Sequence, residues 1–368
     1  MNFEAFVHPQ IRDQPVYEPG RPIDSVARDH GLSPASIAKL ASNENPLGCS
    51  PRVREAIRDV LEELHRYPDG GATFLREALA DRHGLSPDQF LPGNGSNEVL
   101  ELVARACLGP GTEAVMGAQA FIVYKLVTRL VGAKPVEIPM PGYTHDLDAM
   151  AAAVNERTRV VFLPSPNNPT GTANDPDAIL AFARSLPDHV LFVFDEAYAE
   201  YLDEPPDLRP LIAEGRPVLC TRTFSKIHGL AALRIGYGYA DAGLIGLLNR
   251  VREPFNLGSL GQAAARAAIR DADWIARCRE ANRAGLAALS RGLSELGLEV
   301  VPSMANFVLV RVPDPPGLFR DLQTRGLIVR PVAGYGLPEH LRISVGTPAQ
   351  NKRLLTTLGD LLARTPTR

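Results

Sequence analysis

Short apolar runs alternate with amphipathic stretches along most of this chain. Strand-like runs, most of them apolar throughout, occupy residues 114–116, 135–138, 160–163, 190–194 and 218–221. Helical patterns such as residues 51–65 and 176–185 lie between them. Continuous apolar runs are typical of strands that are buried on both faces of a parallel sheet. The alternation therefore predicts a large, doubly wound, mostly parallel α/β domain over residues 46–260.

The pattern changes after residue 260. An alanine-rich stretch, residues 262–292, predicts one long helix, and strand patterns follow at 306–310 and 341–345 with shorter helical stretches between them. This arrangement predicts a smaller α/β domain over residues 261–368. We expect the N-terminal segment, residues 1–45, to pack with this smaller domain.

A lysine follows the last strand-like run of the large domain. Lys226 ends the loop Thr223-Phe224-Ser225-Lys226 at the predicted carboxyl end of the sheet, where open α/β sheets bind ligands. A lysine forms a Schiff base with an aldehyde only if it can lose its proton near neutral pH, which burial or neighbouring cations allow. Thr223, Ser225 and Arg234 could bind a phosphate group beside it. Taken alone, the loop would more often hold a solvated lysine.

Two further strand ends carry polar side chains. Asp195 ends the run 190–194, and a carboxylate in that position could keep the ring nitrogen of pyridoxal phosphate protonated. Tyr198 could donate a hydrogen bond to the phenolic oxygen of the ring. Asn168 could bind the same oxygen from the loop 164–171, whose three prolines should exclude ladder pairing and stiffen the loop. A capped turn at Asp195 and a plain Asn-Pro turn are the alternative interpretations.

A glycine-containing segment precedes a predicted helix. Gly95, Ser96 and Asn97 stand directly before the apolar-periodic stretch 99–104. Free backbone N–H groups at the start of a helix form a cradle for a phosphate group. Ordinary helix capping explains this segment nearly as well.

Taken in order, these segments resemble the fold-type I pyridoxal-phosphate aminotransferases. The segments are Gly95-Ser96-Asn97-Glu98, Asn168-Pro169-Thr170-Gly171, Asp195-Glu196-Ala197-Tyr198, Ser225-Lys226 and Arg234. Residues 17–22, 42–48 and 66–69 narrow the resemblance to the histidinol-phosphate aminotransferase family, over residues 17–346. The resemblance implies a large domain that binds pyridoxal phosphate and a smaller C-terminal domain.

The resemblance also implies roles around the cofactor. Lys226 would carry the Schiff base and move protons, Asp195 would pair with the ring nitrogen, and Tyr198 and Asn168 would bind the phenolic oxygen. Phe121 would stack on the ring, although a core phenylalanine is the commoner interpretation. The remaining cofactor ligands would be Gly95, Ser96, Asn97, Thr223, Ser225 and Arg234.

Other implied contacts concern the substrate and a second subunit. Arg330 and Arg342 would hold the anionic end of the substrate, and an arginine within an apolar strand is costly unless it is paired. Asn43 would also contact substrate, as would Tyr17 on a lid-like N-terminal segment. Tyr67 would reach the cofactor phosphate of the partner in a homodimer with shared active sites.

Three residues depart from the family pattern, and one of them is Gly258, which stands where a polar residue is commoner. Asn97 stands where an acidic residue is usual, and His228 stands where a tyrosine is frequent. The cradle donors are backbone groups, so Asn97 should not prevent phosphate binding. We expect His228 to pack in the core or to support a neighbouring site residue, and not to act as an additional acid or base.

Composition agrees with a cytoplasmic enzyme of two domains. The chain has 368 residues and a formal charge of −3, which gives no sign of nucleic-acid binding. No charged and apolar leader or membrane-spanning stretch is expected. The four cysteines are widely spaced, which suggests reduced thiols and neither a metal site nor disulfides.

The sequence also bears on other classes of function. A nicotinamide dehydrogenase would need a Gly-x-Gly-x-x-Gly segment, and the sequences after Gly93 and Gly236 do not fit it. A cofactor-binding regulator would need a basic DNA-binding module, which is not found. An aromatic amino acid aminotransferase and, more remotely, a threonine-phosphate decarboxylase stay open, because arginine binds carboxylate and phosphate alike. The prediction is an aminotransferase of histidine biosynthesis that acts on histidinol phosphate, with glutamate and 2-oxoglutarate as the other pair.

Overall fold

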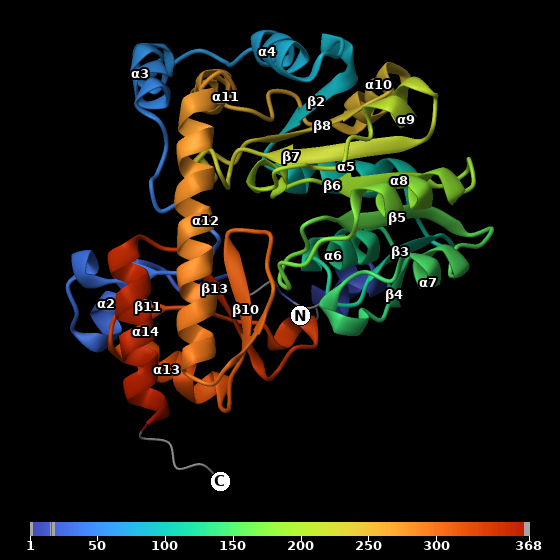
Figure 1. The fold of residues 1–368 in the computed structure, drawn as a ribbon. Helices are drawn as coiled ribbons and strands as arrows, with labels where there is room; N and C mark the ends of the chain where they lie inside the picture. Colours follow the sequence, from blue (N-terminus) through green and yellow to red (C-terminus); the bar gives the residue numbers. More distant parts are fainter. Residues whose placement is uncertain (1–2, 15, 17–18, 364–368) are drawn as a thin grey trace.

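The computed structural model describes residues 3–14, 16 and 19–363. A larger α/β part and a smaller one lie side by side, and the long helix α12 (Ala272–Glu295) runs from the first to the second (Figure 1). No helix in the described part of the chain, α12 included, has both the length and the apolar character needed to cross a membrane.

The larger part is built on a seven-stranded sheet. Its strands, in spatial order, are β2 (Phe90–Gly93), β8 (Gly236–Ala240), β7 (Val218–Thr223), β6 (Leu191–Asp195), β5 (Thr158–Pro164), β3 (Glu113–Gly117) and β4 (Lys134–Ile138). Strand β8 runs antiparallel to both of its neighbours, and the other pairs are parallel. The sheet is therefore mostly parallel, which confirms the predicted fold class.

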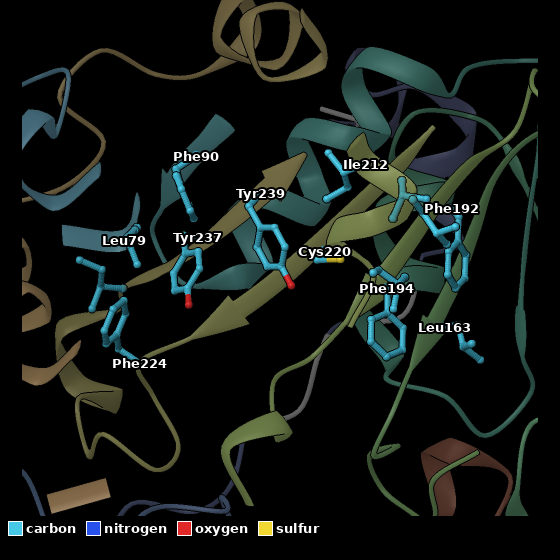
Figure 2. Close-up of a cluster of buried hydrophobic side chains, with 14 of the residues drawn as sticks. Leu79, Phe90, Leu163, Phe192, Phe194, Ile212, Cys220, Phe224, Tyr237 and Tyr239 are labelled. Carbon is cyan, nitrogen blue, oxygen red and sulfur yellow. The ribbon is translucent and has the colours of Figure 1, made fainter. Parts of the chain in front are cut away.

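Successive residues of a strand point to opposite faces of the sheet. Both faces carry apolar side chains here, and helices cover both of them. In β6, Phe192 and Phe194 join one core cluster, and Leu191 and Val193 join the other. Figure 2 shows the first cluster, where aromatic side chains from β2, β6 and β8 stand on one side of the strands. The helices of the first face are α3 (Pro51–Asp59), α4 (Thr73–His83), α7 (Leu147–Ala152), α8 (Pro176–Ser185), α9 (Arg209–Ala213) and α11 (Ser259–Ile269). Those of the second are α5 (Ser96–Cys107), α6 (Ile122–Leu130) and α10 (Ala242–Leu248).

The smaller part has an antiparallel sheet of four strands. Their order is β12 (Arg330–Pro331), β13 (His340–Ser344), β10 (Phe307–Arg311) and β9 (Glu299–Val301). Helices α12, α13 (Pro315–Thr324) and α14 (Pro348–Leu362) pack on this sheet through a core of leucine and valine side chains. In Figure 1 these three helices lie together beside β10 and β13.

Part of the N-terminal segment joins the smaller part. Strand β1 (Ala38–Lys39) pairs in parallel with β11 (Leu327–Ile328), and helix α2 (Ile23–His30) packs on the same side through Val26 and Ala27. The short helix α1 (Pro9–Arg12) instead contacts α6 of the larger part. Residues 41–44 continue from β1 toward the carboxyl end of the large sheet, where they line a cavity.

Three local expectations were wrong. The stretch 262–292 is not one helix, because Asp271 caps a new helix by accepting a hydrogen bond from the Trp274 N–H at 3.3 Å. The helix expected over 51–65 ends at Asp59, and a short 3₁₀ turn follows it. Pro164 does belong to the ladder, opposite Asp195 at the end of β5, because a proline at a strand end lacks only its N–H.

The break at Asp271 separates two packing environments. Helix α11 packs against α3 and α4 and belongs to the core of the large sheet. Helix α12 packs against β9, β10 and α14. The domain boundary at residue 260 stays a prediction, and we propose that α11 be counted with the larger part.

Candidate active site

A cavity of about 250 Å³ lies at the carboxyl ends of β5, β6 and β7. The N-terminal segment contributes residues 41–44 to its wall, and the smaller part contributes Arg330, Tyr335 and Arg342. The remaining lining side chains that the sequence predicted are Ser96, Asn97, Phe121, Asn168, Asp195, Tyr198, Thr223, Ser225, Lys226 and Arg234. Segments distant in the sequence therefore meet at one site, at the sheet edge where ligands bind in this type of fold.

Lys226 stands three residues beyond the end of β7. Its Nζ donates a hydrogen bond to the carbonyl oxygen of Ser42 at 3.2 Å and lies 5.7 Å from the centre of the Tyr198 ring. Burial lowers the pKa of Lys226 to about 7, and the nearby cations Arg342 and Arg234 act in the same direction. A large fraction of the amine is thus neutral near physiological pH, which nucleophilic attack on a carbonyl requires.

Asp195 ends β6 and is buried. Its Oδ2 accepts a hydrogen bond from the Tyr124 hydroxyl at 2.7 Å, and its Oδ1 accepts one from the Ala197 N–H at 3.1 Å. Burial raises the pKa of Asp195, while the hydrogen bond from Tyr124 opposes the rise. A cationic group placed beside the carboxylate would lower that pKa again, so this position suits a protonated ring nitrogen.

Sequence reasoning missed Tyr124. It lies one helical turn after Phe121 on α6, is fully buried, and stacks on Phe162 with ring centres 4.9 Å apart. In the sequence, Tyr124 looks like an ordinary aromatic residue of the core. Its contact with Asp195 was therefore not visible there. Phe121 lines the cavity and meets the Tyr124 ring edge-on at 5.8 Å.

The two predicted phenolic-oxygen ligands occupy the same cavity. The Tyr198 oxygen accepts a hydrogen bond from Asn43 Nδ2 at 2.8 Å, and burial raises the pKa of Tyr198 to about 12. Asn168 Oδ1 accepts a hydrogen bond from Arg342 Nη1 at 2.5 Å. Tyr198 is therefore held as a neutral phenol, which can donate its proton in a hydrogen bond.

The predicted anion cradle consists of the start of α5 and the loop after β7, which lie close together. Gly95 has φ +75°, and a Cβ there would lie 2.8 Å from Arg234 Nη2, so a side chain would crowd the guanidinium. Arg234 Nη1 donates to Ser225 Oγ at 3.3 Å, and the Ser225 N–H donates to Thr223 Oγ1 at 3.1 Å. The helix start, the hydroxyls and the guanidinium together fit a phosphate group.

Two arginines face the cavity from the smaller sheet. Arg330 and Arg342 are direct partners in the ladder between β12 and β13. Arg342 Nη2 donates to the Ala41 carbonyl oxygen at 2.5 Å, and its guanidinium lies 5.4 Å from the centre of the Phe307 ring. A substrate anion would meet two positive charges here.

Three predicted site residues are not placed in the lining of this cavity, and one of them, Gly95, lies beside it at the start of α5, next to Arg234. Tyr67 is 83% exposed, stacks on Phe255 with ring centres 4.7 Å apart, and does not line the cavity. Tyr17 lies outside the described residues. Residues that line the cavity without having been predicted include Ser42, Glu44, Tyr124 and Tyr335.

His228 is buried against Phe224, with ring centres 4.8 Å apart. Burial lowers the pKa of His228 to about 3, so the ring is neutral. This environment supports the predicted packing role. The described residues contain no group of three or more His, Cys, Asp or Glu side chains arranged to hold a metal ion.

Comparisons with known proteins agree with this architecture. The family model of aminotransferase class I and II matches residues 35–358. The chain is 49% identical over 366 residues to histidinol-phosphate aminotransferase 2 of Pseudomonas fluorescens, with 99% of each chain covered. It is 47% identical over 359 residues to histidinol-phosphate aminotransferase of Methylobacillus flagellatus, with 97% of each covered.

Solved structures show the same fold. Histidinol-phosphate aminotransferase from Sinorhizobium meliloti, in complex with pyridoxal-5'-phosphate, superposes with a TM-score of 0.88 at 28% identity and covers 97% of both chains. Aspartate aminotransferase from Thermus thermophilus with maleate gives a TM-score of 0.80 at 24% identity, over 96% of this chain and 99% of that one. A family match over most of the chain, joined to a full-length sequence relationship, shows that this protein belongs to the aminotransferase class I and II family.

Proposed function

We propose that this protein is a pyridoxal-phosphate-dependent aminotransferase that transfers the amino group of histidinol phosphate, with glutamate and 2-oxoglutarate as the other pair, in histidine biosynthesis. The observation that carries the proposal is one cavity that joins a lysine with a pKa near 7, a buried carboxylate, an anion cradle and two arginines. Full-length relatives at 46–49% identity bear the name histidinol-phosphate aminotransferase.

The side chains fit pyridoxal phosphate at both of its ends. The cradle of Gly95, Ser96 and Arg234 would hold the phosphate, and the buried Asp195 would face the ring nitrogen. Bound in this way, the cofactor would supply an electron sink for the electron pair of the substrate carbon. Tyr198 and Asn168 would bind the phenolic oxygen, and Phe121 would cover the ring.

Lys226 would perform the proton transfers. Its Nζ lies between the Ser42 carbonyl and the Tyr198 ring, inside the cavity, and a neutral amine there can accept a proton from the substrate carbon. Arg330 and Arg342 would orient the substrate by its anionic group, which fixes the reacting carbon near Lys226. Tyr17 and Asn43 stay proposed substrate contacts from the resemblance.

We also propose a cytoplasmic homodimer with shared active sites. Tyr67 and Phe255 form an exposed aromatic pair, and Leu64 and Phe74 nearby in the sequence are each 57% exposed. A protein surface with several exposed large apolar side chains is typical of an interface. All four cysteines are free thiols, as is usual in a reducing compartment.

The substrate is tested by steady-state kinetics with histidinol phosphate, phenylalanine and tyrosine as amino donors. We expect kcat/KM for histidinol phosphate to exceed the other two, as the names of the full-length relatives indicate, because the two arginines by themselves accept a carboxylate as well as a phosphate. Histidinol without its phosphate is the matched control and should be a poor donor. Equal or higher kcat/KM for phenylalanine or tyrosine would instead identify an aromatic amino acid aminotransferase.

The lowered pKa of Lys226 predicts a pH dependence of cofactor attachment. Only the neutral amine attacks an aldehyde, so the rate at which cofactor-free protein gains visible absorbance should rise with pH and level off above about 7. Lys226→Ala is the control and should bind cofactor that borohydride cannot fix to the protein. A rate that keeps rising to about pH 10, as for an ordinary lysine, would contradict the prediction.

The role of Asp195 predicts a graded loss of turnover. Asp195→Asn should keep the fold but lower kcat by at least ~100-fold, the scale for losing one preorganised electrostatic partner. Tyr124→Phe removes only the hydroxyl that holds Asp195 and should lower kcat by roughly 10-fold. Circular dichroism checks the fold of both variants, and normal turnover of Asp195→Asn would reduce Asp195 to a turn residue.

The shared site is tested with hybrid dimers. Lys226→Ala protein mixed with an inactive variant such as Tyr67→Asp should regain part of the activity, because some hybrid dimers contain one site with both residues intact. Each inactive variant mixed with itself is the control. A fully active monomer in sedimentation at assay concentration would show that the site is not shared.

A further inference from the structure

Asn43 is buried in a backbone conformation that the residues around it in the sequence do not predict. The residue is 1% exposed and has φ +56°, a left-handed conformation that residues other than glycine rarely adopt. It follows strand β1 in the chain. Each of its polar groups, in the backbone and in the side chain, forms a hydrogen bond with a residue distant in the sequence. Asparagine tolerates this conformation better than most other residues, and the surrounding contacts fix it here.

Four hydrogen bonds hold Asn43. Its backbone N–H donates to Ser344 Oγ at 2.8 Å, and its carbonyl oxygen accepts from Asn306 Nδ2 at 2.9 Å. Ser344 Oγ donates in turn to Asn43 Oδ1 at 3.1 Å, and Asn43 Nδ2 donates to the Tyr198 oxygen at 2.8 Å. Asn43 therefore links Tyr198 of the large sheet to β13 of the smaller sheet.

Ser344 determines which way the amide of Asn43 points. Ser344 is 3% exposed, and its hydroxyl already accepts the Asn43 N–H. If the amide were reversed, Ser344 Oγ would face a second donor, and its own proton would have no acceptor on Asn43. A buried hydroxyl proton without a partner is unfavourable by ~1–3 kcal/mol. The observed orientation, with Nδ2 toward Tyr198, is the favoured one.

The orientation decides where the Tyr198 proton goes. An amide N–H can only donate, so the Tyr198 oxygen acts as acceptor toward Asn43 and keeps its own proton for another partner. With the amide reversed, the phenol would donate to Asn43 Oδ1, and its proton would be used within the protein. The Tyr198 ring is also fixed from the side by Phe307, at 5.4 Å between ring centres.

We infer that Asn43 is a positioning residue: it donates to the Tyr198 oxygen, so that the Tyr198 proton stays available to the phenolic oxygen of the cofactor, and Ser344 holds the amide in that orientation. The inference rests on the role proposed for Tyr198. It makes the hydrogen-bonding state of a cofactor ligand depend on a residue of the smaller sheet.

The test measures the pH at which the visible absorbance of the bound cofactor changes, with no substrate present. A hydrogen bond donated to the phenolic oxygen favours its ionised form, so losing that bond raises the midpoint of the absorbance change. Tyr198→Phe is the reference variant and should raise the midpoint. Asn43→Gly removes the side chain without strain at φ +56° and creates no competing acceptor, but Tyr198 loses the donor to its oxygen and becomes a weaker donor itself, so the midpoint should rise by less than in Tyr198→Phe.

Two further variants sharpen the test. Asn43→Asp keeps the size of the side chain but replaces the donor by an oxygen, so Tyr198 must donate to it, and the midpoint should rise more than in Asn43→Gly. Asn306→Ala is the matched control: it removes a hydrogen bond to the Asn43 backbone and should lower the melting temperature of the cofactor-free protein while leaving the midpoint unchanged. If Asn43→Gly does not fold, Ser344→Ala should give a smaller shift in the same direction.

The double variant Asn43→Gly/Tyr198→Phe separates positioning from a structural role. Its midpoint should equal that of Tyr198→Phe alone, because Asn43 acts on the cofactor only through the Tyr198 hydroxyl. A full additional shift in the double variant, or no shift in either Asn43→Gly or Ser344→Ala while Tyr198→Phe shifts, overturns the inference about Asn43. An unchanged midpoint in Tyr198→Phe overturns the role of Tyr198 and the inference together.

Discussion

The burial of one lysine amine constrains the rest of this structure. Lys226 can lose its proton near pH 7 only if water is kept away from it and cations lie nearby. The carboxyl edge of the large sheet cannot do this alone, because it opens outward. The Ser42 carbonyl comes from the N-terminal segment and Arg342 comes from the smaller sheet. The site is therefore complete only when the N-terminal segment and the two larger parts of the chain are packed together.

Burying charged groups has a free-energy cost that the site offsets with specific partners. Asp195 has the Tyr124 hydroxyl and the Ala197 N–H, and Arg342 has the Asn168 side chain and the Ala41 carbonyl. A third buried group lies next in sequence to Asp195, where Glu196 accepts hydrogen bonds from Arg222 at 3.0 Å and from Tyr239 at 2.5 Å. Such pairs contribute little net stability, but they fix side-chain directions. A site that stabilises developing charge needs polar side chains that are already held in the right direction.

Sequence patterns placed the strands well and some helix ends poorly. The apolar runs that preceded Asp195 and Thr223 are strands β6 and β7, because a strand buried on both faces has to be apolar throughout. The helix break at Asp271 was missed, since the alanine-rich pattern continues through it and a single cap decides the boundary. The end of α3 at Asp59 was missed for a similar reason, because residues 60–65 mix apolar and charged side chains in a way that remains compatible with a helix.

The sequence by itself determined that Lys226, Asp195 and Asn168 follow strand ends, because a local apolar run shows where a buried strand ends. The amine, carboxylate and amide groups of these side chains then indicated the chemistry of the site. Only the tertiary structure decided that Tyr124 holds Asp195 and that Asn43 donates to Tyr198. The members of these pairs are separated by 71 and 155 residues. No local pattern encodes such a contact, because it depends on how helices and sheets from different parts of the chain pack. The direction of a buried hydrogen bond is fixed by that packing, through the requirement that every buried donor have an acceptor.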